Sequence, residues 1–114
     1  MMKHIEISAR VKEALANGEP VVALESSIIS HGMPYPTNLE VAQMAEDVVT
    51  ANGAVPATIG LYQGKIIVGM NAEQRYAISN CPGDEKAKAM KDSVKGIPYA
   101  ISAKKNAGFT IAAI

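Results

Sequence analysis

Cysteine, histidine, tryptophan and long apolar runs are scarce or absent in this chain of 114 residues. The single cysteine, Cys81, excludes a disulfide within the chain, and one cysteine with two histidines does not make a cysteine/histidine metal framework. No run of about 18 consecutive apolar residues occurs, and the first residues are not a basic segment followed by an apolar block. We therefore expect no membrane span and no secretion signal, so the expected location is cytoplasmic.

An excess of charge is also lacking, because 11 basic side chains balance 11 acidic ones. Their distribution is uneven: residues 1–85 hold ten acidic and five basic side chains, whereas residues 86–114 hold one acidic side chain and six lysines. Without arginine or interleaved aromatics, the basic segment is a poor nucleic-acid surface, and we expect no nucleic-acid partner. The lysines are interpreted either as a solvated face or as holding the phosphate of a small molecule. The scattered glycines form no nucleotide-binding loop.

Alternating apolar patterns and turn signals predict an α/β domain. A composition of 48% hydrophobic and 19% charged residues suits one small globular domain. Helices are predicted over residues 8–17, 37–52, 72–78 and 84–90, and strands over residues 21–29, 57–62, 65–69 and 97–102. Ser8 is the expected N-cap of the first helix, Thr37 and Glu40 match a capping box, and Gln63-Gly64 matches a hairpin turn. A crossover together with a hairpin implies a mixed β-sheet flanked by helices.

Glu25 interrupts the apolar run of the strand predicted over residues 21–29. A buried, unpaired carboxylate is so costly that it must find a partner, become neutral through a raised pKa, or lie at the rim of a site. Ser26 and Ser27 could hydrogen-bond Glu25, hold an anionic ligand or cap the strand edge. His31 is either a general base or a hydrogen-bonded structural residue. From the residues alone, Glu25 is either a functional carboxylate or one paired with a helix end or a lysine.

The apolar segment at residues 108–114 has no polar tail or cap. Natural termini seldom lie inside such an element. This pattern leads us to expect the front piece of a longer protein, or a partner in an assembly.

Three blocks of the sequence carry a family resemblance. They are residues 23–38 (ALESSIISHGMPYPTN), residues 53–59 (GAVPATI), and a third block with Lys91-Asp92-Ser93, Ile97-Pro98-Tyr99, Lys105-Asn106 and Thr110-Ile111-Ala112. In these blocks the chain resembles the pseudouridine-5'-phosphate glycosidases, also called pseudouridylate synthases, and the related indigoidine synthase A-like proteins. The resemblance begins near Val11, and residues 70–90 match poorly.

The resemblance implies an indigoidine synthase A-like α/β/α fold. It further implies that residues 1–114 are the N-terminal portion of a single catalytic domain, the remainder of which is absent. The implied reaction is the reversible cleavage of the carbon–carbon glycosidic bond of pseudouridine 5'-phosphate to uracil and ribose 5-phosphate. A lysine forms an imine with the opened sugar and a glutamate donates a proton. A Mn²⁺ cofactor and a homotrimer are also implied.

By motif match, the implied proton donor is Glu25, and an apolar strand around it would raise its pKa. Lys91 is the implied substrate-binding lysine, and Ile111 would contact the substrate through its backbone. The family's imine-forming lysine, manganese-binding aspartate and phosphate loop match nothing in this chain, so we expect no metal ligand here and no activity from this chain alone. Phe109 also departs from the usual threonine.

Two alternatives stay open at this point. One is a non-catalytic binding or assembly module of the same fold. The other is an indigoidine synthase A-like enzyme that acts on another sugar phosphate.

Overall fold

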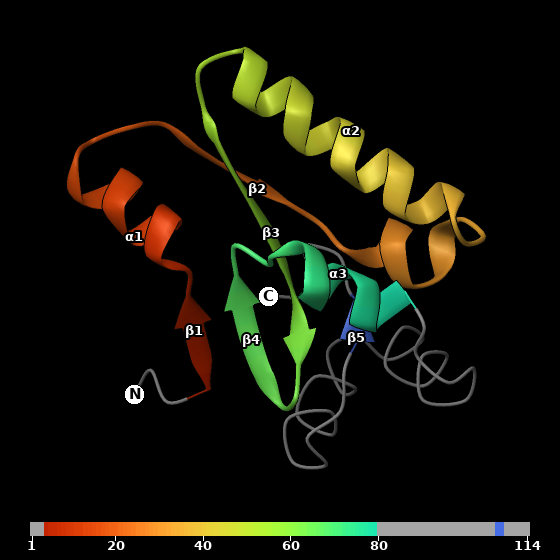
Figure 1. Cartoon of the computed structure of the whole chain (residues 1–114). Coiled ribbons are helices and arrows are strands. Elements are labelled where there is room, and N and C mark those ends of the chain that lie inside the picture. The colour runs from red at the N-terminus through yellow and green to blue at the C-terminus, as the bar shows by residue number, and fades with distance from the viewer. Residues whose placement is uncertain (1–3, 80–106, 109–114) are drawn as a thin grey trace.

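Helices and strands alternate along the chain in a computed structural model, which describes residues 4–79 and 107–108 (Figure 1). The elements are β1 (Ile5–Ile7), α1 (Ala9–Ala16), β2 (Val21–Leu24), the π-helix η1 (Ile28–Gly32), α2 (Thr37–Ala51), β3 (Val55–Tyr62), β4 (Lys65–Val68), α3 (Ala72–Ser79) and β5 (Ala107–Gly108). The predicted α/β class is confirmed. The helix predicted over residues 84–90 and the strand over residues 97–102 lie outside the described residues.

The sheet is mixed and β3 is its central strand. The strand order is β1-β4-β3-β2, and β5 also pairs with β3. Strands β2 and β3 run parallel, with Leu24 opposite Thr58, whereas β4 and β5 run antiparallel to β3. Strand β2 pairs with residues 55–58 of β3 and ends at Leu24, and β5 pairs with the following residues, Gly60 and Leu61. The expected combination of a parallel crossover and a hairpin is thus confirmed.

The hairpin between β3 and β4 has the predicted two-residue turn. Gln63 and Gly64 have φ values of 51° and 80°. Positive φ at both central residues defines the turn that matches the twist of antiparallel strands.

The predicted N-cap is found at the start of α1 but not at the start of α2. At α1 the side chain of Ser8 accepts a hydrogen bond from the backbone N–H of Val11, as an N-cap does. At α2 the capping box is wrong, because Thr37 already lies inside the helix. The carbonyl oxygens of Pro34 and Pro36 accept the first free N–H groups of α2 instead.

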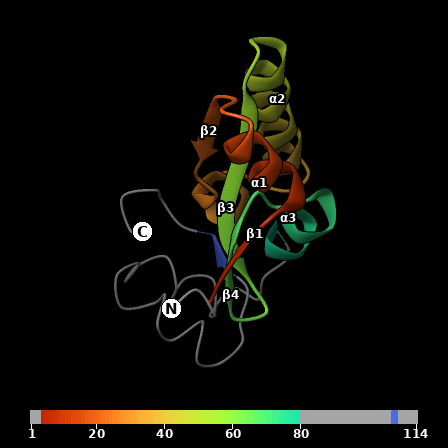
Figure 2. The ribbon, with the colours of Figure 1, turned by 90° about the vertical axis from the view of Figure 1, so that its left-hand side faces the viewer.

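Side chains of β3 point alternately to the two faces of the sheet, and each face is covered by helices. Val55 and Ala57 pack against Val11 and Ala14 of α1, on one face of the sheet. The side chain of Thr58, which points to the opposite face, reaches α2. Figure 2 shows α2 and α3 together on one side of β3. The result is the predicted arrangement of helices on both faces of a sheet.

The strand predicted over residues 21–29 ends early, at Leu24. The carbonyl oxygen of Ser26 accepts hydrogen bonds from the N–H groups of Ile29 and Ser30, which starts a turn that η1 continues. Ile29 is buried in a cluster formed by η1, α2, α3 and the sheet. The apolar pair at residues 28–29 therefore packs against the core from a helix and not from a strand.

Candidate functional site

Glu25 stands where β2 leaves the sheet. It directly follows Leu24, the last residue of β2, which lies opposite Thr58 of the parallel strand β3. The carboxyl ends of parallel strands are where α/β proteins bind ligands. Glu25 is exposed, so the burial on which the expected pKa rested is not found. Its place at the end of a strand nevertheless suits a group that meets a substrate.

The serines around Glu25 divide into two roles. The hydroxyl of Ser27 donates a hydrogen bond to Oε1 of Glu25 over 2.8 Å. Ser26, which precedes η1, and Ser30, which lies within it, are fully buried. Of the roles considered from the sequence, Ser27 therefore takes that of orienting the carboxylate, and Ser26 belongs to the core. Within residues 4–79, Glu25 forms no ion pair.

A small cavity of about 180 Å³ opens beside Glu25. Its walls are mostly apolar and come from the end of β2, η1, α2 and β3. The lining residues are Leu24, Glu25, Ile28, Val41, Ala42, Ala45 and Thr58. Of the described residues that line it, Glu25 alone carries a charge, so the cavity suits an uncharged group held next to a carboxylate.

A buried polar network supports the floor of this cavity. The hydroxyl of Thr58 donates to Oε2 of Glu46 over 2.6 Å, and the guanidinium of Arg75 donates to the same oxygen over 3.0 Å. Arg75 also donates to the carbonyl oxygen of Met70 and to Oε1 of Gln43. Because Glu46 and Arg75 are both largely buried, the network fixes α2 and α3 on β3.

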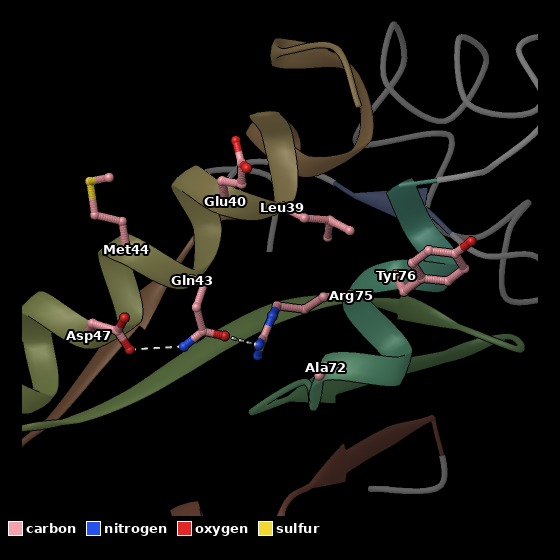
Figure 3. Close-up of a pocket in the computed structure, with 8 residues that line it drawn as sticks. All are labelled: Leu39, Glu40, Gln43, Met44, Asp47, Ala72, Arg75 and Tyr76. Atoms are coloured by element: carbon pink, nitrogen blue, oxygen red, sulfur yellow. Dashed lines mark hydrogen bonds between the residues drawn. The ribbon is translucent and has the colours of Figure 1, made fainter. Parts of the chain in front are cut away.

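A larger groove, about 670 Å³, runs between α2 and α3 (Figure 3). Arg75 and Gln43 point toward each other across it, and Gln43 donates in turn to Asp47. Met44 and Tyr76 line it with exposed apolar surface. Its cation, Arg75, is already engaged in the buried network, whereas the smaller cavity holds the carboxylate of Glu25 at the carboxyl end of a parallel strand.

Not all predicted site residues can be placed. Lys91 and Ile111 lie outside the described residues, as does Cys81. His31 belongs to η1, within the same block of sequence as Glu25. Residues 4–79 and 107–108 bring together no group of three or more His, Cys, Asp or Glu side chains that could hold a metal ion.

Sequence reasoning missed Asn38 and Thr58. The Asn38 side chain, almost fully buried, donates to the carbonyl oxygen of Ile29 over 2.7 Å and accepts from the N–H of Leu39. It thereby ties η1 to the start of α2, two elements that each contribute to the cavity wall. Its place at the end of the block over residues 23–38 is the signal that could have marked it. Thr58 carried the same kind of signal, because it lies in the block over residues 53–59, although a threonine by itself is ordinary in a strand.

A carboxylate at the carboxyl end of a parallel strand, beside a cavity covered by a helix, is typical of α/β proteins that bind small molecules. The chain belongs to the family described as "Indigoidine synthase A like protein", whose model matches residues 10–114. The expected family is confirmed. None of the helices in the described part has the length and apolar character to span a bilayer.

Curated relatives carry one common name. A pseudouridine-5'-phosphate glycosidase of Fervidobacterium nodosum is 50% identical over 107 residues, which are 94% of this chain and 34% of the relative. The protein of the same name from Thermosipho africanus is 47% identical over 105 residues, 92% of this chain and 34% of the relative. The chain thus spans about a third of the length of these relatives.

Two solved structures share the fold. The prealnumycin C-glycosynthase AlnA, in complex with ribulose 5-phosphate, matches with a TM-score of 0.74 and 33% identity over 97% of this chain and 34% of that chain. An indigoidine synthase A-like protein of Thermotoga maritima matches with a TM-score of 0.73 and 29% identity over 96% of this chain and 34% of that chain. The sheet and helices described above are therefore those of this fold family.

Proposed function

We propose that this chain is the N-terminal portion of a pseudouridine-5'-phosphate glycosidase. The enzyme would reversibly convert pseudouridine 5'-phosphate and water into uracil and ribose 5-phosphate. The names of the curated relatives support this reaction. AlnA, named a C-glycosynthase and solved with a pentose phosphate, supports chemistry at a carbon-linked sugar phosphate. The single observation in this chain that carries the proposal is Glu25 at the mouth of the cavity.

Glu25 is proposed as the proton donor. The hydroxyl of Ser27 holds Oε1, which orients the carboxyl group and leaves Oε2 to face a substrate. Opening the ribose ring requires a proton at the ring oxygen, and a general acid at this position would deliver it. Exposure of Glu25 at the end of β2 also allows the carboxyl group to be reprotonated from solvent between turnovers.

The carbon–carbon bond explains why a proton donor alone is insufficient. The base of an ordinary nucleoside leaves on nitrogen, whereas here the bond between C1' and a ring carbon must break. The lysine implied by the family adds at C1' of the opened sugar. When the bond breaks, its electron pair goes to the base, which takes up a proton, and C1' remains as the lysine imine. Water then releases ribose 5-phosphate and restores the lysine.

Lys91 and Ile111 are proposed to complete substrate binding. Lys91 would hold the 5'-phosphate and Ile111 would make a backbone contact, but both lie outside the described residues. The family's manganese-binding aspartate matches nothing in this chain, so no residue named here is given a role toward Mn²⁺. Manganese, the homotrimer and the cytoplasmic location stay predictions.

The decisive experiment measures uracil release from pseudouridine 5'-phosphate. The 114-residue chain by itself is expected to release none, and sustained turnover would show that the imine-forming lysine does not lie elsewhere. In the complete enzyme, Glu25→Gln should lower kcat by about 10²–10⁴-fold while leaving the circular dichroism spectrum unchanged. The matched control is Glu40→Gln, an exposed glutamate on α2 away from the cavity. Equal activities of the two variants would refute the role of Glu25.

One observation favours a second candidate, an enzyme acting on another sugar phosphate. AlnA, at 33% identity, was solved with ribulose 5-phosphate rather than with a pseudouridine nucleotide. Assays of the complete enzyme with several C- and N-glycosyl phosphates separate the two candidates. The first candidate requires pseudouridine 5'-phosphate to be the preferred substrate.

A further inference from the structure

Thr58 is the uncharged polar residue in the lining of the Glu25 cavity. It lies on β3 directly opposite Leu24, the residue before Glu25. Its side chain points to the face covered by α2, as its hydrogen bond to Glu46 shows. The other walls come largely from that helix, so the hydroxyl oxygen lies on the cavity side of the sheet. Thr58 is therefore placed to contact a group that enters beside Glu25.

The hydroxyl hydrogen of Thr58 is already committed. It is donated to Oε2 of Glu46 over 2.6 Å, a short distance typical of a charged acceptor. Arg75 donates to the same oxygen, and both partners of this ion pair are largely buried. Turning the hydroxyl hydrogen toward the cavity would remove a donor from a buried carboxylate. Thr58 can therefore offer a ligand only the lone pairs of its oxygen, and acts there as an acceptor.

The charge of the cavity indicates which part of a nucleotide enters it. Among the described residues, its lining has the carboxylate of Glu25 and no cation, and its remaining walls are mostly apolar. A phosphate group would be repelled by this carboxylate and would find no charged donor among the described lining residues. A neutral, planar base fits both the walls and the volume of about 180 Å³.

We propose that the oxygen of Thr58 accepts a hydrogen bond from N1–H of the base and so selects carbon-linked uracil. This inference rests on the proposed function. In pseudouridine the sugar is attached through C5, which leaves a hydrogen on N1, whereas in uridine N1 carries the sugar. A ligand without that hydrogen leaves the acceptor unpaired in an apolar cavity, and losses of this kind discriminate strongly between related ligands.

Two isomeric probes isolate the N1 hydrogen. Both 5-methyluracil and 1-methyluracil have the same composition, but only the first keeps N1–H. Each is titrated into the ¹⁵N-labelled chain, with the amides of Ile28 and Ala42 as reporters of the cavity. We expect 5-methyluracil to bind about tenfold more tightly. Thr58→Val should abolish this preference and Thr58→Ser should retain it.

The matched control is Thr50→Val, which removes an exposed threonine hydroxyl from α2 at a distance from the cavity. This variant should keep the preference. Equal affinities of the two isomers for the unsubstituted chain would overturn the inference even if Thr58→Val failed to fold, and would leave a base-binding cavity in place. Absence of any shift at the reporters with either isomer would also overturn it. The proposed function is judged separately, by uracil release from the complete enzyme.

Discussion

Removing the guanidinium of Arg75 should destabilise the chain severely. The side chains of Arg75 and Glu46 are only 8% and 15% exposed. In an Arg75→Met variant the carboxylate of Glu46 keeps the hydroxyl of Thr58 as a donor but loses its cation. Breaking a buried ion pair from one side costs about 3–5 kcal/mol, because an uncompensated charge remains buried. That is a large part of the 5–15 kcal/mol by which a small domain is typically stable.

A double-mutant cycle measures whether this charge is the cause. In Glu46→Gln the amide oxygen still accepts a hydrogen bond from Thr58 but carries no charge. The double variant with Arg75→Met should therefore lose about 1–3 kcal/mol less free energy of unfolding than the sum of the two single variants. Urea unfolding followed by circular dichroism gives the four free energies. Arg10→Met, which breaks an exposed pair, is the control and should change little. A loss below about 1 kcal/mol in Arg75→Met, or strict additivity, would refute the reasoning.

Three further outcomes are expected. Gly69→Ala should lower the free energy of unfolding in urea by about 1–3 kcal/mol more than Gly53→Ala does. Both glycines have positive φ, but only at Gly69 would the new Cβ overlap Ser8 and Val11 at the start of α1. Equal losses of stability in the two variants would contradict this. Asn38→Ala should cost about 1–3 kcal/mol and speed hydrogen exchange in η1, since a buried carbonyl loses its donor; unchanged exchange would argue against it. A hydrogen bond from Arg10 lowers the pKa of Glu19, so ionised Glu19 stabilises the folded chain. Glu19→Gln should therefore be less stable than the unsubstituted chain at neutral pH, and this difference should vanish as the pH falls through the lowered pKa of Glu19. Melting temperatures of both proteins from neutral to acidic pH test this.

Local signals were sufficient wherever neighbouring residues set the structure. The N-cap at Ser8 and the turn at Gln63-Gly64 depend on hydrogen bonds and dihedral angles within a few residues. The long helix α2 was equally accessible, because its apolar pattern continues for four turns. The start of α2 was not predicted correctly. The carbonyl oxygens of Pro34 and Pro36 accept the hydrogen bonds that the side chain of Thr37 was expected to accept.

The segment after Leu24 shows where local signals fail. Its apolar residues suit a strand as well as a short helix, and periodicity over so few residues does not separate the two. In the tertiary structure Ile29 packs in the core, and the side-chain amide of Asn38, nine residues beyond Ile29, donates to its carbonyl oxygen. As a consequence Glu25 was expected inside a strand but stands exposed at its end.

By itself the sequence determined the α/β class, most of the element order and, through the block over residues 23–38, the family. These follow from periodicity, turn chemistry and an unusual order of residues, all of which are local properties. Only the tertiary structure decided that Thr58 faces Glu25 across one cavity and that Glu46 and Arg75 fix its hydroxyl. The physical reason is that these residues come from β3, α2 and α3, and only the parallel pairing of β2 with β3 and the packing of both helices on one face bring them together.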